Sequence, residues 1–65
     1  MTKQSAVSLH VELNDDEAGQ LAQFLKRAGL SDYRAKARND AEANTMRDAA
    51  ERVRVALADA GYDPR

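Results

Sequence analysis

The sequence has no cysteine and a single histidine, His10. The lack of cysteine excludes disulfides and thiolate metal sites, and one imidazole cannot anchor a zinc ion by itself. No apolar run approaches the length of a signal-peptide core or a membrane span, which predicts a soluble, cytoplasmic chain without a membrane partner. A glycine-rich phosphate loop is also missing. We therefore expect no enzyme activity, no metal, no cofactor and no small-molecule substrate.

The chain also lacks a charge bias of one sign. Ten Lys+Arg against 11 Asp+Glu give a net charge of -1, unlike a basic nucleic-acid tail or an acidic disordered segment. Residues 1–65 are predicted to form one small domain, and 13 of its hydrophobic residues are alanine. Few large apolar side chains remain for a core, so an isolated monomer should be marginally stable. Self-association is the expected remedy.

The first regular pattern in the chain is an alternation of apolar and polar residues. Four aliphatic side chains fall on one face of an extended segment, and these are Val7, Leu9, Val11 and Leu13. Ser8, His10 and Glu12 fall on the other face. Such a period of two predicts a β-strand over about residues 6–13.

A capped amphipathic helix is predicted next, over about residues 15–28. Asn14 is the expected N-cap, and Glu17 would complete a capping box. Gly29 is expected to end this helix in a left-handed conformation. Ser31 then offers a second N-cap.

A long second helix is predicted over about residues 32–60, because the chain has no glycine or proline there. Gly61 should end it, with Tyr62 folding back on Leu57. Its two apolar faces lie about 120° apart at 100° per residue, which allows a break near Asn39 or Asn44 as the alternative. The unbroken helix is the favoured interpretation.

The predicted fold class is α+β, mostly α, with one strand followed by two helices (β-α-α). A lone strand leaves both of its edges unpaired, so we expect an intertwined homodimer in which two copies form an antiparallel two-stranded ribbon. The alternative is an extended arm on a monomer with two helices. The expected dimer interface consists of Val7, Leu9, Val11, Leu13, Met46, Val53 and Leu57.

Candidate contacts to nucleic acid or to a partner protein lie at the start of the second helix. Residues 31–38 carry a net charge of +2, and a helix N-terminus attracts phosphate. Ion pairs between residues four apart, such as Arg38 with Glu42, are the simpler explanation of these charges. The candidate contact residues are Ser8, His10, Ser31, Arg34, Lys36 and Arg38.

The order of a strand, a capped helix, a Gly29-Leu30-Ser31 turn and a second helix resembles the ribbon-helix-helix regulators. The resemblance implies a paired ribbon in the DNA major groove. It also implies that Gln4, Ser8 and His10 face the bases, while Ser31 and the amides that follow it hold a phosphate. The chain departs from that pattern in its net charge and in the lack of arginine in the ribbon, so DNA binding is the second choice.

Three stretches are similar to an uncharacterised family of very small proteins of proteobacterial phages and prophages. They are residues 21–29 (LAQFLKRAG), 46–50 (MRDAA) and 61–65 (GYDPR). The resemblance implies a non-enzymatic protein that occupies a host macromolecule, as anti-CRISPR inhibitors of bacterial defence do. Our first hypothesis is therefore a homodimeric interaction protein that binds a host or phage protein, and a ribbon-helix-helix type DNA-binding regulator is the alternative.

Overall fold

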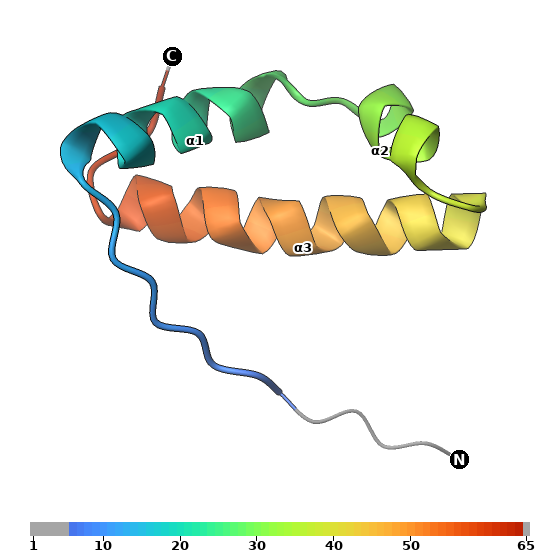
Figure 1. The fold of residues 1–65 in the computed structure, drawn as a ribbon, viewed down its shortest axis with the longest axis horizontal. Helices are drawn as coiled ribbons and strands as arrows, with labels where there is room; N and C mark the ends of the chain where they lie inside the picture. The colour runs from blue at the N-terminus through green and yellow to red at the C-terminus, as the bar shows by residue number, and fades with distance from the viewer. Residues whose placement is uncertain (1–5, 65) are drawn as a thin grey trace.

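A computed structural model describes residues 6–64, and within this range the chain is helical with no β-strand. The helices are α1 (Asp15–Arg27), α2 (Leu30–Lys36) and α3 (Asp40–Asp59). α1 and α2 both pack on α3, whereas the backbones of α1 and α2 do not approach within 8 Å between Cα atoms. Figure 1 shows α3 along one side of the molecule, with α1 and α2 one after the other along the opposite side. Among residues 6–64, α3 is thus the element that holds the other two helices together.

The start of α1 follows from its capping residues. The Asn14 side chain accepts a hydrogen bond from the Glu17 N–H at 2.8 Å, and the Asn14 N–H donates to Glu17 Oε1 at 3.0 Å. Three acidic residues in the first turn and two basic residues in the last turn also suit the helix dipole. The predicted capping box and helix are therefore confirmed, with the helix ending at Arg27.

The expected left-handed Gly29 is wrong. Gly29 has extended backbone (φ -110°, ψ 175°) and is the N-cap of α2, where its N–H donates to Asp32 Oδ2 at 2.8 Å. Ser31 is therefore inside the first turn of α2 and is not the N-cap. Because Asp32 caps α2 from within the helix, the connection after α1 does not need a left-handed residue.

The favoured single helix over 32–60 is also wrong, and the break near Asn39 is what the structure has. α2 ends at Lys36, and α3 begins at Asp40 after Asn39, whose side chain accepts from the Glu42 N–H at 2.8 Å. Asparagine is a weak helix former and a strong N-cap, so a break here costs little. The break between α2 and α3 lets the apolar faces on either side of residue 39 point in different directions.

The end of α3 matches its prediction. Gly61 is left-handed (φ 104°), and the Tyr62 N–H donates to the Leu57 carbonyl at 2.8 Å. The Gly61 N–H donates to the Ala58 carbonyl at 3.0 Å, which completes a Schellman motif. Tyr62 packs against the core cluster that contains Leu57, as expected.

The core is built mainly from alanine. Ala18 and Ala22 of α1 form a buried cluster with Leu57 of α3, and Ala43 is buried separately near the beginning of α3. The chain exposes 5756 Å², whereas area scaling gives roughly 4,100 Å² for a compact protein of this mass. Its radius of gyration is 13.3 Å, against about 10.7 Å for a compact chain of this length. The fold leaves unusually much surface uncovered.

The β-α-α fold with its intermolecular ribbon is not what the structure has. Residues 6–13 have no regular secondary structure, and Figure 1 shows them leaving α1 and running below α3, away from α1 and α2. Alternating polarity indicates extended backbone, but a strand also needs a hydrogen-bonded neighbour. Among residues 6–64 no segment fills that role. The alternative of an extended arm is therefore correct at this position, and we call residues 6–13 the arm.

Candidate interaction surface

The arm presents aliphatic side chains directly to solvent. Val7 is 79% exposed, Leu9 81% and Val11 69%, while Leu13, beside the start of α1, is less exposed. On the polar positions between them, His10 Nε2 lies 3.8 Å from Glu12 Oε2, and both side chains are largely open to water. Covering a row of exposed aliphatic residues with another apolar surface lowers the free energy, so such a row marks a candidate interaction surface.

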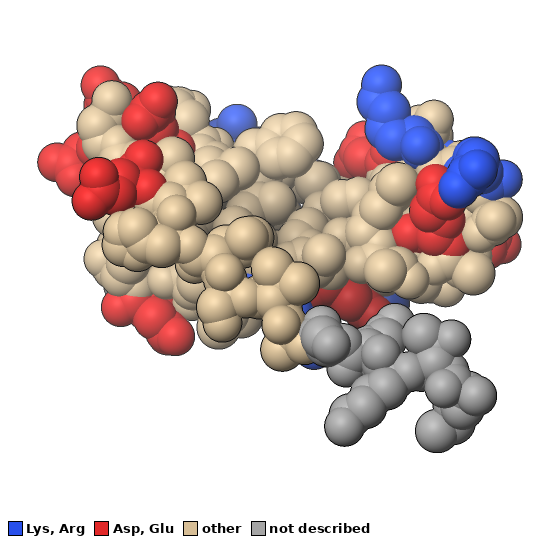
Figure 2. Space-filling model, turned by 60° about the horizontal axis from the view of Figure 1, so that its bottom comes forward, with Lys and Arg blue, Asp and Glu red and all other residues tan. Residues whose placement is uncertain are grey.

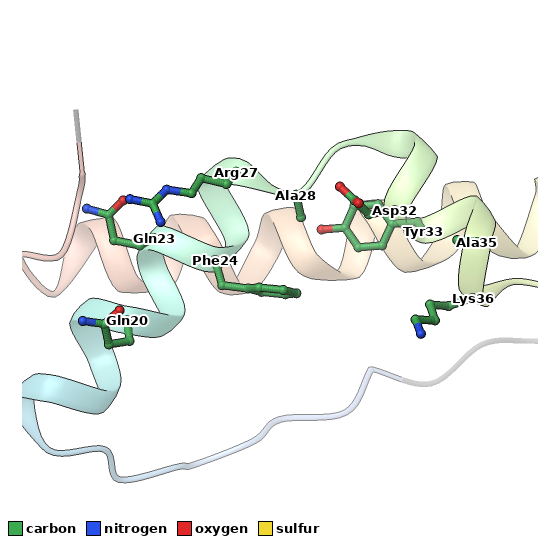
Figure 3. Close-up of a pocket in the computed structure, with 9 residues that line it drawn as sticks. All are labelled: Gln20, Gln23, Phe24, Arg27, Ala28, Asp32, Tyr33, Ala35 and Lys36. Atoms are coloured by element: carbon green, nitrogen blue, oxygen red, sulfur yellow. The ribbon is translucent and has the colours of Figure 1, made fainter.

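A second apolar feature lies in the space between α1 and α2, which we call the hollow. It has a volume of about 710 Å³ and is open to solvent. Figure 3 shows Phe24 extending from α1 toward α2, and Tyr33 extending from α2 toward α1. Phe24 is 63% exposed although phenylalanine is usually buried. The other residues that line the hollow are Gln20, Gln23, Arg27, Ala28, Asp32, Ala35 and Lys36.

The exposed position of Phe24 was not predicted from the sequence. Ala18, Leu21, Ala22 and Leu25 of α1 pack toward α3 and define its buried face. At 100° per residue, Phe24 lies about 110° from the middle of that face. The apolar stripe of α1 is therefore wider than the surface α3 can cover, and this angular offset is the signal in the sequence that could have identified Phe24.

The predicted basic contacts are mostly paired within the chain. Arg34 lies 3.4 Å from Asp40, and Arg38 lies 3.2 Å from Glu42, which confirms the second of these as an i,i+4 ion pair. Lys36 lines the hollow and has no acidic partner within 4 Å in the part of the chain that the structure describes. Pairing of both arginines lowers the positive potential that a phosphate backbone would need.

The other predicted contacts lie on different parts of the surface. Ser8 and His10 are exposed on the arm, and Ser31 is exposed on α2. Gln4, expected to face DNA bases, lies outside the described residues. Among the expected dimer residues of α3, Leu57 is buried inside the chain, Met46 is half-buried and Val53 is 43% exposed. Leu57 therefore packs within its own chain, and the remaining interface predictions are untested.

The C-terminal segment is fastened to α1. The Tyr62 hydroxyl donates to Asp15 Oδ1, and Lys26 Nζ donates to the Pro64 carbonyl. The hydrogen bond to the Asp15 carboxylate raises the pKa of Tyr62, with desolvation and the charge of Asp15 adding to it. These contacts fasten the segment after α3 to both the first turn and the last turn of α1.

Charge is distributed unevenly along the molecule. Figure 2 shows acidic side chains gathered at the end where α1 begins, while lysine and arginine lie among further acidic side chains at the opposite end. The acidic end includes the first turn of α1, and basic residues occur in the last turn of α2. On α3, a hydrogen bond from Arg54 to Glu51 lowers the pKa of Glu51.

Within residues 6–64, no three histidine or carboxylate side chains lie close enough together to hold a metal ion. None of the helices there has both the length and the apolar character that crossing a membrane requires. Comparison with curated proteins and with solved structures finds no match to the chain.

A family model does match the chain, and the match agrees with the expectation of an uncharacterised family. The model is described as that of a family of unknown function, DUF7706, and it matches residues 1–65. Since the match covers the whole chain, the protein belongs to the DUF7706 family.

Proposed function

We propose that this protein is a non-enzymatic interaction protein that acts as a homodimer by binding another protein. The observation that carries the proposal is the exposure of large apolar side chains while alanine fills the core. Leu9 and Phe24 are 81% and 63% exposed, yet Leu57 is the only large side chain in the buried core of the described residues. Uncovered apolar surface of this kind is typical of proteins that function in complexes.

The side chains on the described surface suit binding to another protein better than they suit catalysis. A catalytic centre needs a nucleophile, acid or base held in a partly enclosed site with partners that orient it. The one histidine lies on the exposed arm beside Glu12. The hollow is lined by aromatic, amide and charged side chains, with no hydroxyl other than that of Tyr33. Such a lining suits the docking of an apolar segment.

The partner that we propose is a protein complex of a bacterial host, in the cytoplasm, whose activity the dimer blocks. This part rests on the similarity of residues 21–29, 46–50 and 61–65 to very small phage and prophage proteins. A short chain without a catalytic centre can inhibit a large complex only by occupying a surface that the complex needs. Exposed aliphatic and aromatic anchors are the side chains that contribute most to such binding.

The experiment compares two arm variants that differ only in the face they change. Leu9→Asp puts a charge on the aliphatic face, and Ser8→Asp puts the same charge on the polar face one residue away. The tagged wild-type chain is used to capture its partner from a host lysate, and the purified pair is then measured by titration calorimetry. We expect Leu9→Asp to weaken binding at least about tenfold and Ser8→Asp to change it less than about twofold.

Two results would refute the proposal. One is equal binding by the two variants, which would remove the aliphatic face from the interaction. The other is that the chain binds no protein saturably but binds duplex DNA with a steep salt dependence, which would favour a nucleic-acid function.

A further inference from the structure

The arm and the hollow are two apolar features of the same chain, and neither is covered by it. Leu9 and Phe24 are the most exposed large aliphatic and aromatic side chains of the described residues, at 81% and 63%. We propose that the hollow of one copy receives the arm of a second copy, and that the exchange is reciprocal across a two-fold axis. The inference deepens the homodimer of the proposed function, on which it rests, by naming its contact surface. Leu9 and Phe24 then hold the two copies together, and the host protein is bound by the assembled dimer. Leu9→Asp therefore weakens host binding through loss of the dimer.

The shapes of the two features are compatible. Extended backbone sends Val7, Leu9 and Val11 to one face, so they can enter a groove together while the polar residues stay outside. The hollow has a volume of about 710 Å³, within the range of pockets that enclose ligands. The rings of Phe24 and Tyr33 extend into this space from its two sides and offer apolar surface there (Figure 3). An aliphatic row fits this lining better than a charged segment does.

The charges are also complementary. The arm carries one formal charge, the carboxylate of Glu12. The hollow is lined by Arg27 and Lys36 against a single Asp32, a net charge of +1. Neither of these two cations has an acidic partner within 4 Å among residues 6–64. An arm in the hollow would bring an acidic residue to a rim whose basic residues are unpaired in that range.

The exposed area is sufficient for a stable dimer. The chain exposes 5756 Å², which is about 1,700 Å² more than area scaling gives for a compact monomer of this mass. A standard stable interface buries about 800 Å² on each partner. Two reciprocal contacts between an arm and a hollow can therefore supply a normal interface from surface that this fold leaves in excess.

The direction of the arm favours a second copy over the arm's own hollow. Figure 1 shows the arm leaving the start of α1 and running below α3, and none of its residues lines the hollow. To enter its own hollow the chain would have to change direction at Leu13 and Asn14. Asn14 is fixed there by its two capping hydrogen bonds with Glu17 and has extended backbone (ψ 172°). A neighbouring copy can accept the arm without disturbing that cap.

The absence of cysteine makes a clean cross-linking experiment possible, because any introduced thiol is the only one in its chain. One copy carries Leu9→Cys and an affinity tag, and the other carries Ala35→Cys in the hollow. The two are mixed and treated with a short bis-maleimide, which tolerates small differences in register. The matched control replaces Ala35→Cys with Val55→Cys, a partly exposed position on α3 outside the hollow. Circular dichroism of each variant checks that it is folded.

The expected product is a covalent pair of one tagged and one untagged chain, formed at least about tenfold faster with Ala35→Cys than with Val55→Cys. Equal rates for the two would overturn the inference. A double variant with both Leu9→Cys and Ala35→Cys tests the other geometry. If it cross-links within one chain and the mixture gives no covalent pair, the arm occupies its own hollow and the inference is wrong.

Sedimentation equilibrium separates a failure of this contact from a failure of the homodimer. Wild-type protein should have twice the chain mass of 7.1 kDa. Phe24→Ser should raise the dimer dissociation constant at least about tenfold, and Val55→Ser less than about twofold. A dimer that Phe24→Ser leaves unchanged refutes the arm and hollow contact alone. A wild-type monomer at millimolar concentration refutes the homodimer as well, while capture of a host protein remains an independent result.

Discussion

Leu57→Ala tests whether the fold depends on Leu57, the one large buried side chain among residues 6–64. Leu57 packs from α3 against Ala18 and Ala22 of α1, and it is 9% exposed. The substitution removes three carbon groups at about 0.8 kcal/mol each, and the cavity left behind adds to that loss. We expect the free energy of unfolding to fall by about 2.5 to 4 kcal/mol. This is a large share of the total, since stability per residue is on the order of 0.1 kcal/mol.

The assay is urea unfolding followed by circular dichroism at a fixed protein concentration, because the proposed self-association would make stability depend on concentration. Val55→Ala is the matched control, since Val55 is 43% exposed on the same helix. Its effect should stay within about 0.5 kcal/mol, as the helix propensity of alanine offsets the lost contact. A loss below about 1 kcal/mol for Leu57→Ala, or one equal to that of the control, would show that the cluster around Leu57 does not hold α1 on α3.

Three further predictions concern the caps and the C-terminal segment. Asn39→Ala should lower the free energy of unfolding by about 1 kcal/mol through loss of the α3 cap, whereas Asn44→Ala should not, and urea unfolding distinguishes them. Gly61→Ala should cost about 1 kcal/mol in the same assay because of its positive φ, but Gly29→Ala, with ordinary extended backbone, should be nearly neutral. The raised pKa of Tyr62 means that the folded state favours the protonated phenol. The stabilisation that its hydrogen bond to Asp15 contributes is therefore complete below about pH 10 and is lost as pH rises through the folded pKa. Stability measured from pH 8 to 11 should therefore fall more steeply for wild type than for Tyr62→Phe, and parallel curves would contradict the role of the hydroxyl.

The elements that could be predicted from the sequence are those whose interactions are local. The capping box of Asn14 and Glu17 involves residues three apart, and the Schellman motif at Gly61 uses the last turn of its own helix. Neither depends on the rest of the fold. Both were therefore predictable from the residue types and their spacing alone.

The features that could not be predicted depend on alternatives of similar free energy or on contacts between distant residues. Asn39 is acceptable inside a helix and favourable as a cap, so tertiary packing decides between one helix and two. The alternation in residues 6–13 indicated an extended segment correctly, but it carries no information about a pairing partner. The hollow joins residues of two helices that touch only through α3, which no periodicity within one helix reveals.

The alanine core and the exposed anchors have a common physical cause. Alanine at buried positions lets α1 approach α3 closely, but each such residue removes little apolar area from water. With Ala18, Ala22 and Ala43 at the contacts, the larger apolar residues lie beside the buried faces or on the arm, as Phe24 and Leu9 do. Replacing the small residues with large ones would not bury these side chains, because it would push the helices apart. A chain of this composition therefore leaves large apolar side chains exposed as a consequence of how its own helices pack, and its free energy of unfolding should rise when a partner covers them.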